Sequence, residues 1–79
     1  MPEPAPSAWM QLPADAQRFL SGNRAAAVIN LWFEDDGSLA CSPEQAGERL
    51  GLLLLEVGSY PDAIKCACEF TASLCRRSA

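Results

Sequence analysis

The sequence predicts a single small domain of the α+β class: a short helix, a two-stranded antiparallel β-hairpin and two packed C-terminal helices (α-β-β-α-α). Three observations lead to this prediction. Apolar residues alternate over residues 26–42, a helix-capping motif begins at Ser42, and a broad apolar face follows Pro61. We expect residues 13–79 to form the domain and residues 1–12 to form an extended tail.

The tail is predicted from Pro2, Pro4 and Pro6, whose spacing favours an extended, polyproline-like chain and opposes helix formation. Trp9 is unusual in a free tail. It either folds back onto the core of the domain or inserts as an anchor into a partner's groove, because tryptophan often dominates binding energy. Both interpretations stay open from the sequence.

A short helix is predicted over residues 13–21. Pro13 suits the first helical position, and Asp15 lies in the first turn, where the helix dipole favours an acid. Gly22 and Asn23 suit a C-terminal cap. The apolar face of this helix comprises Leu12, Ala16, Phe19 and Leu20.

Residues 26–42 predict the hairpin, because apolar residues recur there at every second position. The inward face comprises Ala27, Ile29, Leu31 and Phe33, and the outward face comprises Val28, Asn30, Trp32 and Glu34. A three-residue loop with a left-handed Gly37 pairs Leu39 with Phe33. We prefer this register because it keeps Leu39 and Cys41 on the apolar side.

The helix predicted over residues 43–57 has the clearest start in the chain. Ser42 caps it, and Gln45, three residues later, completes a capping box. Its core stripe comprises Ala46, Leu50, Leu53, Leu54 and Val57. Leu52 and Leu55 lie off this stripe among acidic neighbours, so they are either covered by another element or exposed.

The last predicted helix, over residues 61–77, carries an apolar arc about 200° wide. The arc comprises Ala63, Ile64, Ala67, Phe70, Leu74 and Cys75. In the preceding helix, Gly47 and Gly51 permit the close approach of a neighbour. The small Ala63 and Ala67 should therefore lie against them in an antiparallel helix pair.

Composition and charge argue against several classes of function. The 79 residues carry 10 acids against 6 bases, for a net charge of −4, and no histidine. Without histidine there is no Ser-His-Asp triad, no Cys-His pair and no mixed Cys/His zinc site. Because the bases are scattered, we expect no direct nucleic-acid binding. Because the net charge is negative, we expect a basic protein partner.

The chain is 49% hydrophobic, which is apolar for a small monomer, so we expect surplus apolar surface and a homodimer. The longest apolar run, residues 52–55, is too short to span a membrane, which takes about 20 residues. No basic segment followed by a long apolar stretch opens the chain, and we expect a cytoplasmic location without membrane contact.

The cysteines do not have the spacing of a typical zinc site. Cys66 and Cys68, two apart on a helix, point about 200° away from each other, and Cys75 lies about 10 Å along the axis from Cys68. We interpret all of them as reduced, small apolar residues and expect no cofactor or metal. A disulfide from Cys41 to one helix cysteine stays open.

The predicted hairpin tip carries three adjacent acids, Glu34, Asp35 and Asp36. Such acids on a tip are solvated, and they do not face each other across a cleft as a hydrolytic pair does. Nor do they match the alternate ligand spacing of a calcium loop. We interpret the tip as an acidic knob that meets a basic partner.

These observations favour a non-catalytic protein-interaction module: an inhibitor or adaptor of a larger, basic assembly that handles nucleic acid. In size and charge alone it resembles the small anti-defence proteins of phages. The candidate interface residues are Trp9, Val28, Trp32, Glu34, Asp35, Asp36, Leu52 and Leu55. The alternatives are a homo-oligomerising structural subunit, a small transcriptional regulator that uses the last two helices, and a thiol redox or metal-binding protein.

Overall fold

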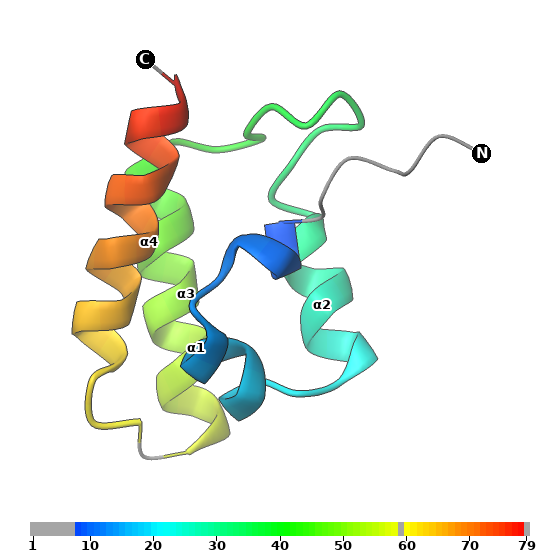
Figure 1. Cartoon of the computed structure of the whole chain (residues 1–79). Coiled ribbons are helices and arrows are strands. Elements are labelled where there is room, and N and C mark those ends of the chain that lie inside the picture. Colours follow the sequence, from blue (N-terminus) through cyan, green and yellow to red (C-terminus); the bar gives the residue numbers. More distant parts are fainter. Residues whose placement is uncertain (1–7, 59, 79) are drawn as a thin grey trace.

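Five helical elements make up the computed structural model, which describes residues 8–58 and 60–78. They are the 3₁₀-helix η1 (Ala8–Gln11) and the α-helices α1 (Ala14–Phe19), α2 (Asn23–Asn30), α3 (Pro43–Val57) and α4 (Ala63–Ser78) (Figure 1). No β-strand occurs in these ranges, so the predicted α+β class with its β-hairpin is wrong and the fold is mostly helical. None of the helices described has both the length and the apolar character needed to cross a membrane.

The capping motif predicted at Ser42 is confirmed and sets the start of α3. The Gln45 amide donates to the Ser42 Oγ at 3.1 Å, and the Ser42 amide donates to the Gln45 Oε1 at 3.1 Å. Both amides belong to the helix start, where donors have no intrahelical acceptor. At its other end α3 stops at Gly58, whose φ of 148° strains any residue with a side chain.

Helices α3 and α4 run antiparallel side by side and share the most extensive contact in the fold (Figure 1). Gly47 and Gly51 of α3 face α4 at this contact. A methyl group at Gly47 would overlap the Thr71 Oγ1 and lie 3.1 Å from the Ala67 carbonyl oxygen. A methyl group at Gly51 would lie 3.5 Å from the Ala67 Cβ. The predicted contact between Gly51 and Ala67 is confirmed.

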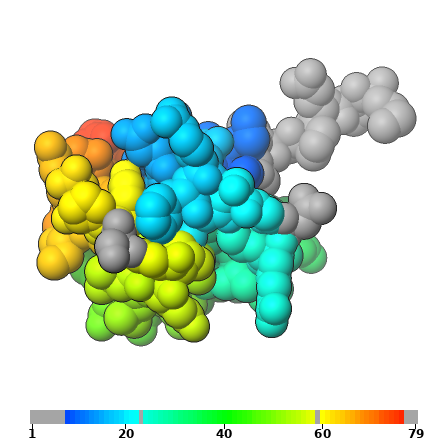
Figure 2. All heavy atoms as spheres, turned by 90° about the horizontal axis from the view of Figure 1, so that it is seen from below, coloured from blue at the N-terminus to red at the C-terminus, as the bar shows by residue number. Residues whose placement is uncertain are grey.

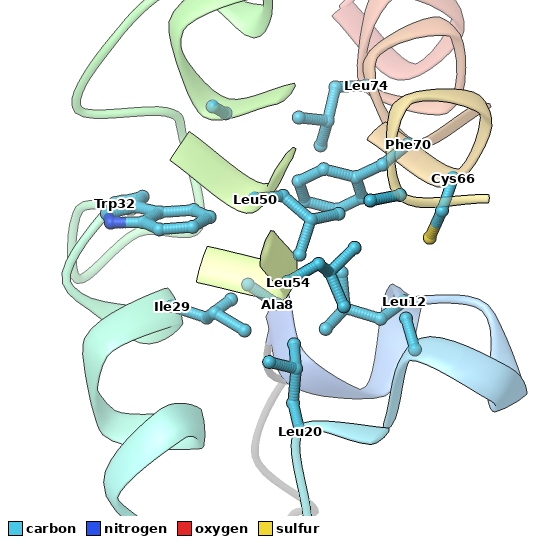
Figure 3. Close-up of a cluster of buried hydrophobic side chains, with 13 residues drawn as sticks. Ala8, Leu12, Leu20, Ile29, Trp32, Leu50, Leu54, Cys66, Phe70 and Leu74 are labelled. Atoms are coloured by element: carbon cyan, nitrogen blue, oxygen red, sulfur yellow. The ribbon is translucent and has the colours of Figure 1, made fainter. Parts of the chain in front are cut away.

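One side of the α3–α4 pair is covered by the N-terminal half of the chain. Figure 2 shows the blue and cyan N-terminal segments lying directly against the yellow-green end of α3. Side chains from all five elements and their connections form one buried cluster: Ala8, Leu12, Ala16, Leu20, Ile29, Trp32, Ala46, Leu50, Leu54, Ala63, Cys66, Phe70 and Leu74. Figure 3 shows the indole of Trp32 pointing toward Leu50 of α3 within this core.

The first strand of the predicted hairpin is instead helix α2. Three consecutive alanines, residues 25–27 and among the best helix formers, lie within this helix. Ile29 of the helix and Trp32 of the turn that follows it are three apart, and both are buried. The alternating pattern was misleading because apolar residues occupy both of its faces and also satisfy helical spacing. The helix tightens at its end, where the Trp32 amide donates to the Ile29 carbonyl at 3.0 Å, and Trp32 enters the core.

One pairing of the predicted hairpin is present as an isolated antiparallel bridge between Phe33 and Leu39. The Glu34 amide donates to the Ser38 carbonyl at 2.7 Å, and the Ala40 amide donates to the Trp32 carbonyl at 2.8 Å. Gly37 has a φ of 89°, the left-handed conformation expected for it. The turn was therefore predicted correctly, but the flanking segments do not extend into strands.

Residues 8–12 of the predicted tail belong to the folded part of the chain. Residues 8–11 form η1, which packs against α2, and Ala8 and Leu12 are buried in the core. Trp9 is half-buried and packs against the same cluster, in line with the fold-back interpretation. The proline-rich residues 1–7 lie outside the described residues.

The residues that α4 buries differ from the predicted apolar arc at the edges of that arc. Ala63, Phe70 and Leu74 are buried as expected. Cys66, which was not assigned to the arc, is also buried, whereas Ile64 is 75% exposed. The broad arc thus faces the core with one edge and leaves its other edge uncovered.

Replacing Trp32 with alanine should destabilise the protein by about 3–5 kcal/mol, because it removes an aromatic side chain that is only 7% exposed. Urea denaturation followed by circular dichroism measures this change. The control is Leu31→Ala at the neighbouring position, where the side chain is 77% exposed and the expected effect is below about 0.5 kcal/mol. Equal midpoints for the two variants would contradict this placement of Trp32.

Replacing Gly47 with alanine should lower stability by about 1–3 kcal/mol, because the added methyl group overlaps Thr71. Gly51→Ala is the matched control at the next turn, where the methyl group fits and helix propensity contributes up to about 1 kcal/mol of stabilisation. Urea midpoints of the two variants should move in opposite directions. A Gly47→Ala/Thr71→Ala double variant should recover part of the loss, and no recovery would contradict the stated contact.

Candidate functional site

A groove of about 550 Å³ runs between α3 and α4 on a side of the helix pair where apolar side chains stay exposed. Its floor consists of small residues at the helix contact: Gly47, Gly51, Ala67 and Thr71. Thr71 donates its hydroxyl hydrogen to the Ala67 carbonyl at 2.8 Å, so this polar group is satisfied within α4. The floor therefore presents little free hydrogen-bonding capacity.

The groove has an apolar end where the last turns of α3 meet the first turns of α4. Leu52 and Leu55 line it from α3, and Ile64 and Cys68 line it from α4. Leu52 is 61% exposed and Leu55 is 57% exposed, because α3 directs Leu50 and Leu54 into the core and turns these two leucines away from it. This end is an exposed apolar surface supported by two rigid helices.

The opposite end of the groove is acidic. Glu44 and Glu48, in the first turns of α3, line the groove beside Ala72 near the end of α4. No lysine or arginine is among the described residues that line it. The same groove therefore changes from apolar to negatively charged along its length.

Two of the predicted interface residues, Leu52 and Leu55, come together in this groove. Ile64 and Cys68 were missed. Ile64 had been assigned to the core arc of the last helix, and its high exposure and its position beside the exposed Leu52 and Leu55 show that it belongs to the open side. The sequence signal was an apolar arc too broad for one buried face.

The other predicted interface residues do not line the groove. Trp32, expected on an outward strand face, is buried in the core because the turn that ends α2 directs it inward, so it is not an exposed interface residue. Val28 is partly exposed on α2, and Trp9 packs against the core. The acidic residues 34–36 are exposed on the turn between α2 and α3.

The acidic turn is ordered by its own hydrogen bonds. The Asp36 carboxylate accepts from the Ser38 hydroxyl at 2.6 Å and from the Ser38 amide at 2.9 Å. These bonds favour the ionised form and lower the pKa of Asp36 below its ordinary value of 3.8. They define a local turn and leave Glu34 and Asp35 exposed beside it.

All four cysteines are free thiols, and no disulfide involves Cys41. Cys66 is buried in the core, whereas Cys68 is exposed in the groove, as their spacing on a helix predicted. Burial raises the pKa of the Cys66 thiol above its ordinary value of 9.0, which makes it less nucleophilic. Within the described parts of the chain, no three residues of the His, Cys, Asp or Glu types are arranged to hold a metal ion.

Stability should be almost independent of pH between about pH 6 and pH 8, since the chain has no histidine. The lowered pKa of Asp36 contributes stability that is lost only as the pH falls below 3.8. Desolvation disfavours the ionised forms of Cys66 and Tyr60 and raises both pKa values, so stability falls as the pH rises above 9.0 for Cys66 and above 10.0 for Tyr60. Urea unfolding midpoints measured from acid to alkaline pH give the dependence of stability on pH. A midpoint that shifts between about pH 6 and pH 8 would contradict the expectation.

Comparisons of the chain with protein-family models, with curated proteins and with solved structures gave no match. The function proposed below is therefore inferred from the groove between α3 and α4.

Proposed function

We propose that this protein is a non-catalytic interaction module that binds a protein partner through the groove between α3 and α4. The observation that carries this proposal is the clustering of Leu52, Leu55 and Ile64, each more than half exposed, around one groove. Single exposed apolar side chains are ordinary in small proteins. A contiguous group over a groove is typical of a binding surface.

Covering this apolar surface supplies part of the free energy of a complex. Covering one large, mostly exposed apolar side chain contributes about 1–2 kcal/mol. Three such side chains surround a floor with little free hydrogen-bonding capacity, so few polar groups need to be desolvated. The remaining affinity comes from the wider contact and from the charged end of the groove.

An interaction module of this kind acts by occupying its partner, as an inhibitor or an adaptor does. The proposed partner is a basic protein, because the chain has a net charge of −4 and Glu44 and Glu48 border the apolar surface. A cytoplasmic setting is part of the proposal, since four free thiols suit a reducing compartment. The phage-inhibitor analogy rests on size and charge alone.

The double substitution Leu52→Ser/Leu55→Ser should abolish partner capture while the helical circular dichroism spectrum stays unchanged, because both side chains are exposed. The measurement is affinity capture from a lysate of the source organism, with quantitative mass spectrometry of the bound proteins. The wild-type chain and the double variant are compared in parallel.

The matched control is Leu31→Ser, which removes an equally apolar and even more exposed leucine that does not line the groove. Proteins that bind through the groove should stay bound to this control. If the double variant captures the same partners in the same amounts as the wild type, the groove is not the binding surface and the proposal fails.

A further inference from the structure

We infer that the partner segment in the groove is a basic amphipathic helix, with its apolar side chains over Leu52, Leu55 and Ile64 and its basic side chains beside Glu44 and Glu48. This inference rests on the proposed function, because it names the occupant of the same groove. It is carried by the shape of the groove and by the distribution of charge along it.

The shape of the groove suits a third helix. Two antiparallel helices form its walls, and its floor is made of small residues, so a helix lying between the walls can approach both backbones closely. The lining residues of α3 extend from Glu44 to Leu55, which corresponds to about 17 Å of helix axis. A ligand helix of about three turns covers this length.

The charge distribution defines the ligand's pattern. Glu48 and Leu55 are two turns apart on α3, or about 10 Å along the axis. A complementary helix therefore carries apolar residues at i, i+3 and i+4 and lysine or arginine about seven residues away. The end carrying the basic residues must lie at the acidic end of the groove, since no base among the described lining residues neutralises Glu44 or Glu48.

A second copy of this chain is a poorer occupant than a basic helix. It would present the same concave surface, and two grooves do not fill each other. It would also bring a second Glu44 and Glu48 to the interface without a lining lysine or arginine, and both copies carry a net charge of −4. The homodimer expected from composition is therefore the competing outcome of the test.

The probe is a fluorescein-labelled, blocked alanine-based peptide with three leucines at i, i+3 and i+4 and two lysines about seven residues further along. Fluorescence anisotropy should show saturable binding to the wild-type chain that weakens as salt is raised. A peptide that differs from this probe only in a central proline cannot form the helix and should not bind. A peptide with glutamates in place of the lysines should bind at least about fivefold more weakly.

Variants of the protein test which end of the groove binds the leucines of the peptide and which end binds its lysines. The double variant Leu52→Ser/Leu55→Ser should bind the lysine peptide more than about tenfold more weakly than the wild type does. The double variant Glu44→Gln/Glu48→Gln should bind the lysine peptide about fivefold more weakly, and its affinity should depend little on salt concentration. Glu44→Lys/Glu48→Lys should reverse the preference, so that the glutamate peptide now binds more tightly than the lysine peptide. The Leu31→Ser control should bind like the wild type.

Any of three results obtained with peptides that bind, or with the protein alone, would overturn the inference. They are equal binding of lysine and glutamate peptides to the wild type, binding of the proline peptide, or wild-type self-association in sedimentation that Leu52→Ser/Leu55→Ser removes. If none of the peptides binds while capture of a lysate protein still depends on Leu52 and Leu55, the basic-helix inference fails and the proposed interaction function stands.

Discussion

The close approach of α3 and α4 at Gly47 and Gly51 is the contact on which the rest of the structure depends. At Gly47 the missing side chain leaves room for the Thr71 hydroxyl, and at Gly51 the backbone lies close to Ala67 with room for a methyl group. Two helices packed this closely form a rigid platform from a short chain. One side of that platform holds the core leucines, and the other side carries the groove.

The N-terminal half of the chain is long enough to cover only part of this platform. η1, α1 and α2 supply Ala8, Ala16 and Ile29 to the core, and the connections beside them add Leu12, Leu20 and Trp32. The groove side of α3 and α4 is left with leucines and an isoleucine exposed. This exposed apolar surface on two packed helices is the basis of the proposed binding function.

The error over residues 26–42 has a specific physical cause. A run with apolar residues on both faces satisfies the period of a strand and that of a helix, so periodicity alone cannot separate them. The three alanines of α2 favour a helix. α2 also packs against η1, and its Ile29 is buried in the core. The turn at Gly37 depended on local geometry and was predicted correctly, down to the pairing of Phe33 with Leu39.

The sequence by itself determined the features that depend on neighbouring residues: the capping box at Ser42, the extent of α3, the turn at Gly37 and the small residues between the last two helices. It also marked Leu52 and Leu55 as lying off the core stripe. The tertiary structure decided which edge of each broad apolar arc is covered, burying Cys66 and Trp32 and exposing Ile64. That choice depends on where η1, α1 and α2 pack, and such long-range contacts leave no local pattern in the chain.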